Sequence, residues 1–135
     1  MIAQLIASII SEYATVTYDG GLLADTAAIY FGTAPDRKSY PFTSVYLPDT
    51  QMDFSFCSDF FDFLVQFNVY DRGKSPANVL LIQDAIYEGF NNTALTGLDG
   101  TQLRLAPISF NCVQSEDEDG HIGVCQFKCV VEKVR

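Results

Sequence analysis

The sequence is poor in the residue types on which catalytic and nucleic-acid-binding sites depend. Its 135 residues include no tryptophan, a single histidine, and eight Lys and Arg against 17 Asp and Glu, for a net charge of -9 at pH 7. An acidic domain repels nucleic-acid phosphates and anionic lipids at long range. A Cys–His pair or a Ser–His–Asp triad would both need His121, which falls in the acidic turn 115–121. We therefore expect neither an enzyme nor a dedicated DNA-binding surface.

Long apolar runs are also absent. No stretch approaches the roughly 20 apolar residues that span a bilayer. The apolar residues 1–14 lack a positively charged start and a cleavage-like site. We therefore expect no membrane partner, and assembly from cytosolic material.

The four cysteines show no metal-binding spacing. They are Cys57, Cys112, Cys125 and Cys129, and none forms a CxxC pair. Thiols without tight spacing in a chain that is not secreted are usually reduced core residues. A shared zinc site would require the fold to bring three or four of them together. We expect core thiols, with no metal and no cofactor.

Apolar residues, in contrast, are abundant and regularly spaced. The chain is 48% hydrophobic and 13% aromatic, which suits one domain spanning residues 1–135. The i, i+3, i+4, i+7 spacing in residues 1–14 predicts an amphipathic helix. A second helix is predicted after Ser75 as N-cap and Pro76 at the first position. Its core stripe consists of Val79, Ile82, Ile86 and Phe90.

Alternating apolar and polar residues predict the strands. Residues 42–47 are rich in aromatic and β-branched types, and residues 60–70 alternate most clearly, with Val65, Phe67 and Val69 on one face. The last forty residues predict an antiparallel hairpin with a bulge at Pro107. The expected fold is α+β, a twisted, mostly antiparallel sheet with two helices packed on one face.

Two short motifs invite a chemical interpretation. Gly73-Lys74-Ser75 resembles the end of a phosphate-binding loop, but that loop needs a glycine five residues earlier, where Asn68 lies within a predicted strand. The acidic run 116–119 lacks the alternating ligands of a calcium loop. It is typical of a solvated hairpin tip, or of an acidic loop that DNA slides past without sticking.

The order of features resembles the tail terminator, or tail-completion, proteins of long-tailed bacteriophages. The likeness covers nearly the whole chain. It consists of the N-terminal helix, residues 29–35 (IYFGTAP), the Tyr40-Pro41-Phe42 stretch, residues 65–71 (VQFNVYD) before a Ser-capped helix, and a hairpin tip holding Asp119-Gly120-His121. The long acidic tip and the four cysteines depart from the family pattern.

This resemblance implies a structural virion protein that acts without catalysis or cofactor. Such proteins form a ring, usually a hexamer, that caps the tail tube, stops its polymerisation and joins the tail to the head side. The implied partners are other copies of the chain, the tail tube protein and a head–tail connector or neck protein, with DNA only as passing cargo. The implied location is the neck end of the virion tail, after assembly in the host cytoplasm. The alternatives are a neck or connector protein and a small ligand-binding domain.

Charge is unevenly spread along the chain, which suggests how a ring could join. The basic candidates for subunit or partner contact are Arg37, Lys38, Arg72 and Lys74. The acidic candidates are Glu116, Asp117, Glu118 and Asp119. In a head-to-tail ring, one subunit's basic loop would meet its neighbour's acidic loop.

Overall fold

The computed structural model describes residues 2–32, 35, 39–54, 58–73, 75–91, 94–98, 101–114 and 120–134. Its elements are, in order, α1 (Ile2–Tyr13), β1 (Thr17–Tyr18), β2 (Gly21–Leu22), α2 (Leu23–Thr26), β3 (Ala28–Phe31), β4 (Phe42–Phe54), β5 (Ser58–Arg72), α3 (Ala77–Phe90), β6 (Ala94–Leu98), β7 (Thr101–Gln114) and β8 (Gly120–Val134). The expected α+β class is confirmed.

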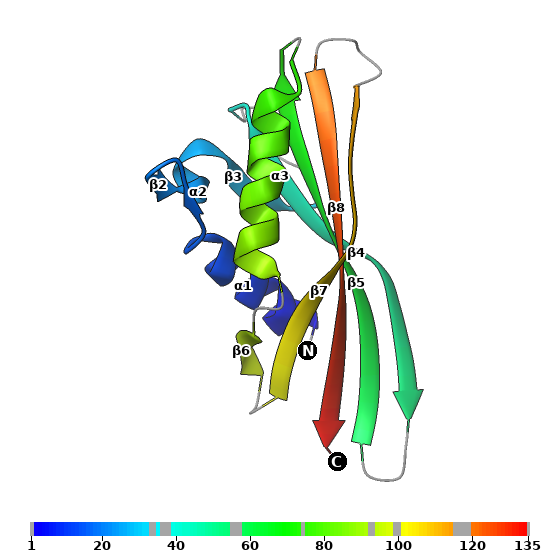
Figure 1. Ribbon diagram of the computed structural model, residues 1–135. Coiled ribbons are helices and arrows are strands. Elements are labelled where there is room, and N and C mark those ends of the chain that lie inside the picture. The colour runs from blue at the N-terminus through cyan, green and yellow to red at the C-terminus, as the bar shows by residue number, and fades with distance from the viewer. Residues whose placement is uncertain are drawn as a thin grey trace.

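One twisted sheet organises the chain (Figure 1). Its strand order is β3-β4-β5-β8-β7-β6, and every neighbouring pair is antiparallel except β3 and β4, which are parallel. β1 and β2 form a separate hairpin whose turn residues, Asp19 and Gly20, have φ of 49° and 79°. Such positive values match the turn that joins two antiparallel strands by two residues.

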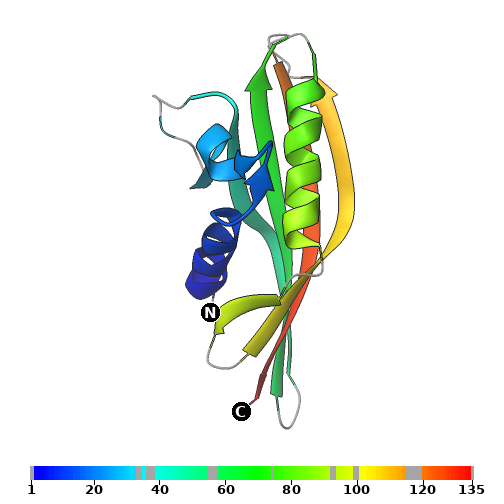
Figure 2. The same ribbon diagram turned by 60° about the vertical axis from the view of Figure 1, so that its left-hand side comes forward.

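The two longer helices lie on the same side of the sheet, as the two views show (Figure 1 and Figure 2). The ends of β4, β5 and β8 extend beyond them, and we call this projecting part of the sheet the arm. Its backbone register runs from Thr50↔Phe63 to Phe54↔Asp59 in the β4–β5 ladder. We call the sheet face opposite the helices the open face.

A single apolar core fills the space between helices and sheet. Alternate residues of the strands point to this side, as the period-two pattern requires. The rings of Phe67 and Phe90 are 5.0 Å apart, and those of Phe67 and Phe127 are 5.7 Å apart. Burying each such side chain contributes about 1.5–3 kcal/mol. The fully buried large side chains include Tyr13, Phe67, Phe90, Phe127, Leu5, Ile9, Leu23, Ile82, Ile86 and Leu105.

α3 is seated on β8 at Gly123. A Cβ on this residue would approach Cδ of Gln83 and Cγ1 of Val79 to 2.6 Å each, so only glycine leaves room for the helix. The buried Gln83 side chain uses the space: its Nε2 donates to the carbonyl oxygens of Asn111 at 2.8 Å and Val124 at 3.4 Å. The amide thus ties α3 to both β7 and β8.

Several expectations from the sequence are confirmed, and others need correction. A register shift occurs in β7 between Pro107 and Ser109, as predicted, and another occurs in β4 between Tyr46 and Asp49, next to Pro48. The N-cap position of α3 is Pro76 rather than Ser75, although Oγ of Ser75 still accepts the N–H of Ala77 at 3.2 Å. The four-residue helix α2 and the strand β6 were not predicted.

Candidate functional site

Only one of the eight charged candidates lies in the part of the chain that the structure describes. Arg72 is the last residue of β5, and its side chain is exposed. Its Cζ lies 4.4 Å from the centre of the Tyr40 ring. Its backbone N–H donates to Oδ1 of Asp71 at 2.9 Å. The others, Arg37, Lys38, Lys74, Glu116, Asp117, Glu118 and Asp119, lie outside the described residues.

An aromatic cluster lies beneath Arg72 at this corner of the sheet. Phe42 stacks on Tyr70, with ring centroids 4.8 Å apart, and meets Tyr40 and Tyr30 edge to face at 5.2 and 6.0 Å. A guanidinium over a tyrosine ring gains about 0.5–1 kcal/mol at an exposed site. The cluster therefore holds Arg72 in place at the surface instead of leaving it a free charge.

The strand that leads to this corner rules out a phosphate-binding loop. Asn68 lies within β5, paired in register with Ser44 and Val124, so no glycine-rich loop surrounds the place where phosphates would sit. Its side chain donates to Oη of Tyr70 at 3.2 Å and to Oη of Tyr46. The chain folds this stretch as sheet through Arg72, followed by the turn at Gly73, whose φ is 132°.

The open face around Asn68 carries a network of uncharged side chains. Nε2 of Gln66 donates to Oη of Tyr46 at 3.1 Å and to Oδ1 of Asn68 at 2.9 Å, and Nε2 of Gln126 donates to Oε1 of Gln66 at 2.9 Å. Burial, together with the nearby Tyr70, raises the pKa of the Tyr46 hydroxyl, which further favours its neutral form. The network joins β4, β5 and β8 across the open face.

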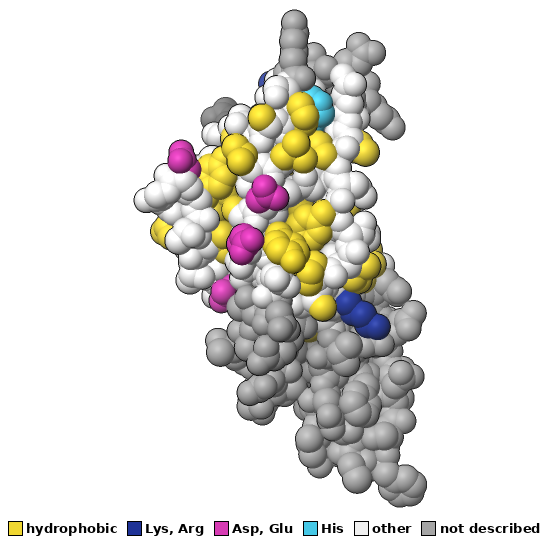
Figure 3. All heavy atoms as spheres, viewed as in Figure 1, with side chains coloured by type: hydrophobic (Ala, Val, Ile, Leu, Met, Phe, Trp, Pro, Cys, Tyr) yellow, Lys and Arg dark blue, Asp and Glu magenta, His cyan; other side chains and the backbone are white. Residues whose placement is uncertain are grey.

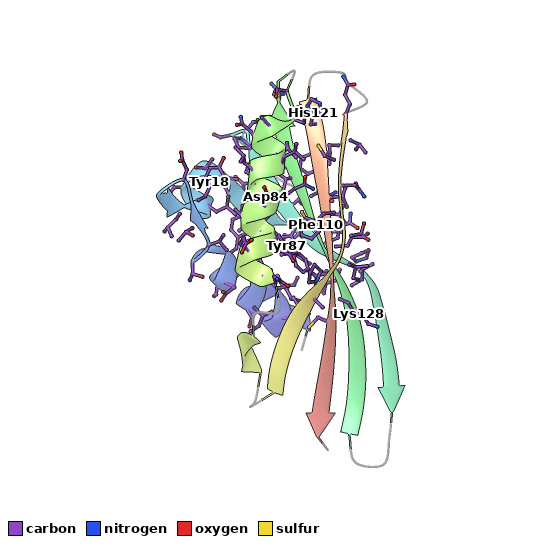
Figure 4. All side chains as sticks on the ribbon, in the orientation of Figure 1. Tyr18, Asp84, Tyr87, Phe110, His121 and Lys128 are labelled. Carbon is purple, nitrogen blue, oxygen red and sulfur yellow. The ribbon has the colours of Figure 1, made fainter. Side chains whose placement is uncertain are left out.

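His121 is not at the hairpin tip as expected, because β8 begins at Gly120. It is the second residue of β8, paired in register with Asp71 and Gln114 (Figure 4). Its Nδ1 is buried and has no hydrogen-bond partner among the described residues. The prediction of an exposed turn through residue 121 is therefore wrong by two residues.

The expectation of core thiols is confirmed for two cysteines. Cys125 and Cys129 are fully buried, and Cys112 is half-buried, while Cys57 lies outside the described residues. Burial raises the pKa of the Cys125 thiol to about 12. Within the described ranges, no three His, Cys, Asp or Glu side chains gather in a way that could hold a metal ion.

The outer side of α3 carries several exposed apolar side chains. Hydrophobic side chains gather around this helix, interspersed with acidic ones (Figure 3). Tyr87 meets Phe110 of β7 edge to face at 5.7 Å, between the helix and the strand (Figure 4). Leu80 and Leu81 are 46% and 53% exposed. Helical spacing places Leu80, seven residues before Tyr87, on the Tyr87 side of α3, and Leu81 about 100° further round.

A small cavity of about 180 Å³ lies between the end of α1 and the end of α3. Its two charged lining residues are Glu12 and Glu88, and Gly89 lies close against Val16 on its wall. Neither helix has a basic residue in its last turn. The cavity therefore combines two carboxylates with the negative ends of two helices.

Comparison with known proteins shows the fold. No family profile matches the sequence, and no curated protein matches it. One solved structure with a similar chain is the virion of a native gene transfer agent particle, with a TM-score of 0.71 and 17% sequence identity. The match covers 97% of this chain and 96% of that chain. None of the described helices is both long and apolar enough to cross a membrane.

Proposed function

We propose that the protein is a structural subunit of a phage-like virion, and that within the virion it is the tail terminator. The subunits form a ring, a hexamer, that caps the tail tube, stops its polymerisation and joins the tail to the head side. The observation that carries the proposal is the similarity to a virion chain over almost the full length of both proteins. The role is structural, without catalysis or cofactor.

The arrangement of surfaces supports a role in assembly. The arm extends the backbone of β4, β5 and β8 beyond the helices, which gives the subunit reach toward a neighbouring protein. Arg72 is held on an aromatic cluster at the opposite end of β5, where a partner can meet it. The network on the open face consists of amide and tyrosine hydroxyl groups, none of which carries a charge that would attract DNA phosphates.

Light scattering after size exclusion tests the ring. The expected result is the mass of a ring, or a monomer that becomes a ring when purified tail tubes are added. A chain that remains a monomer with and without tubes contradicts the proposal. If such a monomer also bound a nucleotide, the ligand-binding alternative would be favoured. Separate binding assays with tail tubes and with connector protein distinguish the tail terminator from a neck protein.

Charge reversal tests whether basic and acidic loops join the subunits. The variant combines Arg72→Glu with Lys74→Glu, and it is expected to weaken the oligomer most at low salt, where screening is weakest. Lys128→Glu is the matched control, because Lys128 is an exposed cation on the open face of β8. An oligomer that is unchanged at low and high salt would remove this contact from the proposal while leaving the ring itself intact.

A further inference from the structure

One margin of the sheet is unpaired over part of its length. β6 pairs with β7 only from Ala94↔Arg104 to Leu98↔Thr101. Residues 109–114 of β7, which we call the β7 edge, therefore have β8 on one side and no described strand on the other. Natural proteins usually protect such edges with charges, prolines or bulges. The β7 edge, SFNCVQ, has neither a charge nor a proline, and Pro107 and the bulge precede it.

Apolar side chains flank the β7 edge on both faces of the sheet. On the helix side, Tyr87 contacts Phe110, and Leu80 lies two turns earlier on the same side of α3. Tyr87 and Leu80 are 39% and 46% exposed. On the open face, Val113 is 51% exposed beside Ile122. A strand added to this edge would gain backbone hydrogen bonds and bury apolar surface on both of its faces.

The backbone groups that would bond an added strand can be identified. Because Gln83 reaches the carbonyl oxygens of Asn111 and Val124 together, these oxygens lie at the seam between β7 and β8. In an antiparallel ladder, alternate residues turn their N–H and C=O to opposite sides. Phe110 and Cys112 therefore direct theirs away from β8, toward the unpaired side.

The opposite margin of the same sheet supplies a matching strand. β3 is the terminal strand there, and Phe31 is 55% exposed. β3 runs parallel to β4, and three successive antiparallel steps through β5 and β8 reach β7, so β3 and β7 run in opposite directions. If a second copy is related by rotation about an axis along the strands, its β3 meets the β7 edge in the antiparallel sense.

We propose that the β7 edge binds β3 of a second copy of this chain, so that the sheet continues from subunit to subunit around the ring. This inference rests on the proposed function and names its subunit contact. Pairing of two β7 edges about a two-fold axis would stop at two copies and leave both β3 strands unpaired. Head-to-tail pairing gives the β3 strand and the β7 edge of every subunit a partner strand, and it can close into a ring.

Lysine substitutions at exposed positions test the contact without disturbing the core. Leu80→Lys, Val113→Lys and Phe31→Lys are each expected to raise the protein concentration for half-assembly by about tenfold or more, since each places a charge against the added strand. Leu81→Lys is the matched control, because Leu81 is 53% exposed against 46% for Leu80 and lies about 100° further round α3, on the side away from β7. If the three edge variants assemble like Leu81→Lys, the edge contact is wrong.

Disulfide cross-linking tests which strands meet. Cys112 lies on the β7 edge with its side chain on the helix side. Phe31 is two residues from Ile29 in β3, so the two side chains share a face, and Ile29 packs against the core on the helix side. Phe31→Cys should therefore give cross-linked multimers under mild oxidation, and adding Cys112→Ser should abolish them. Tyr30→Cys, on the opposite face, should not cross-link to Cys112.

The outcomes separate this contact from the ring itself. A ring by mass that shows no Phe31→Cys cross-linking and no response to the lysine variants overturns the edge contact but leaves the proposed function standing. Cross-linked dimers that form through Cys112 alone indicate two-fold pairing of β7 edges and also overturn it. A chain that stays monomeric with tail tubes overturns the proposed function, and with it the ring built on this contact.

Discussion

Substituting Gly123 with alanine tests how closely α3 is seated on the sheet. The added Cβ would lie 2.6 Å from Cδ of Gln83, 2.8 Å from its Nε2 and 2.6 Å from Cγ1 of Val79, whereas ordinary contacts begin near 3.4 Å. The helix must therefore shift by several tenths of an ångström, or the Gln83 side chain must leave its site. Either response acts at the centre of the contact between α3 and β8.

The expected destabilisation follows from these two responses. Overpacking of a close contact costs about 1–3 kcal/mol. Displacing Gln83 would lose its hydrogen bonds to Asn111 and Val124, each of which contributes about 1 kcal/mol. Alanine also lowers the conformational entropy of the unfolded chain, which stabilises the folded protein by about 0.4–1 kcal/mol. With either response, we expect a net loss of about 1–2 kcal/mol in the free energy of unfolding.

Urea unfolding followed by far-UV circular dichroism measures this loss, since the chain has no tryptophan to report by fluorescence. With a urea m-value of about 2 kcal/mol/M, the midpoint should fall by about 0.5–1 M. Gly21→Ala is the control, because its Cβ would come no nearer than 3.8 Å to the carbonyl oxygen of Tyr18. It should be neutral or stabilising by up to about 1 kcal/mol. A Gly123→Ala midpoint equal to that of the unsubstituted chain would refute the close seating.

Three further predictions concern buried groups. Tyr13→Phe should cost about 1–2 kcal/mol in urea unfolding, because the Tyr13 hydroxyl donates to the Ala27 carbonyl at 2.8 Å and pairs with Oγ1 of Thr43 at 2.9 Å; an unchanged midpoint would contradict this. Because burial raises the pKa of Cys125 from 9.0 to about 12, its contribution to stability is complete below about pH 9. This contribution to the free energy of unfolding should be lost between about pH 9 and 12, by up to about 1.4 kcal/mol per pH unit. Cys125→Ala should remove this part of the pH dependence of stability. A thiol reagent should label the half-buried Cys112 in the native protein well before Cys125, and simultaneous labelling would argue against the buried position of Cys125.

Local patterns were enough to predict the main elements. The 3.6-residue spacing of Val79, Ile82 and Ile86 predicted a helix whose apolar stripe is buried, because any helix with that stripe must cover it. The alternation through Phe67 and Val69 predicted β5 and its buried face in the same way. The bulge beside Pro107 was also predictable, since proline cannot donate to a strand ladder.

Features that depend on a few residues or on distant ones were missed. α2 has four residues, which is too short for a periodic pattern. The start of β8 at Gly120 depends on its pairing with Arg72 across the sheet, and this pairing moved His121 from the expected turn into a strand. The shift of the α3 N-cap from Ser75 to Pro76 is a difference of one residue, within the range over which helix ends vary.

The charge of the protein, its two longer helices, its principal strands and the face that each of them buries could all be predicted from the amino-acid sequence. All of these follow from composition or from periodicity over one element. The tertiary structure was needed to show that β3 lies beside β4, that α3 rests on Gly123, and that residues 109–114 of β7 pair with β8 but have no second strand beside them among the described residues. The physical reason is that alternation assigns a residue to one face of a strand, whereas the choice of neighbouring strand is made by hydrogen bonds and packing between residues far apart in the chain.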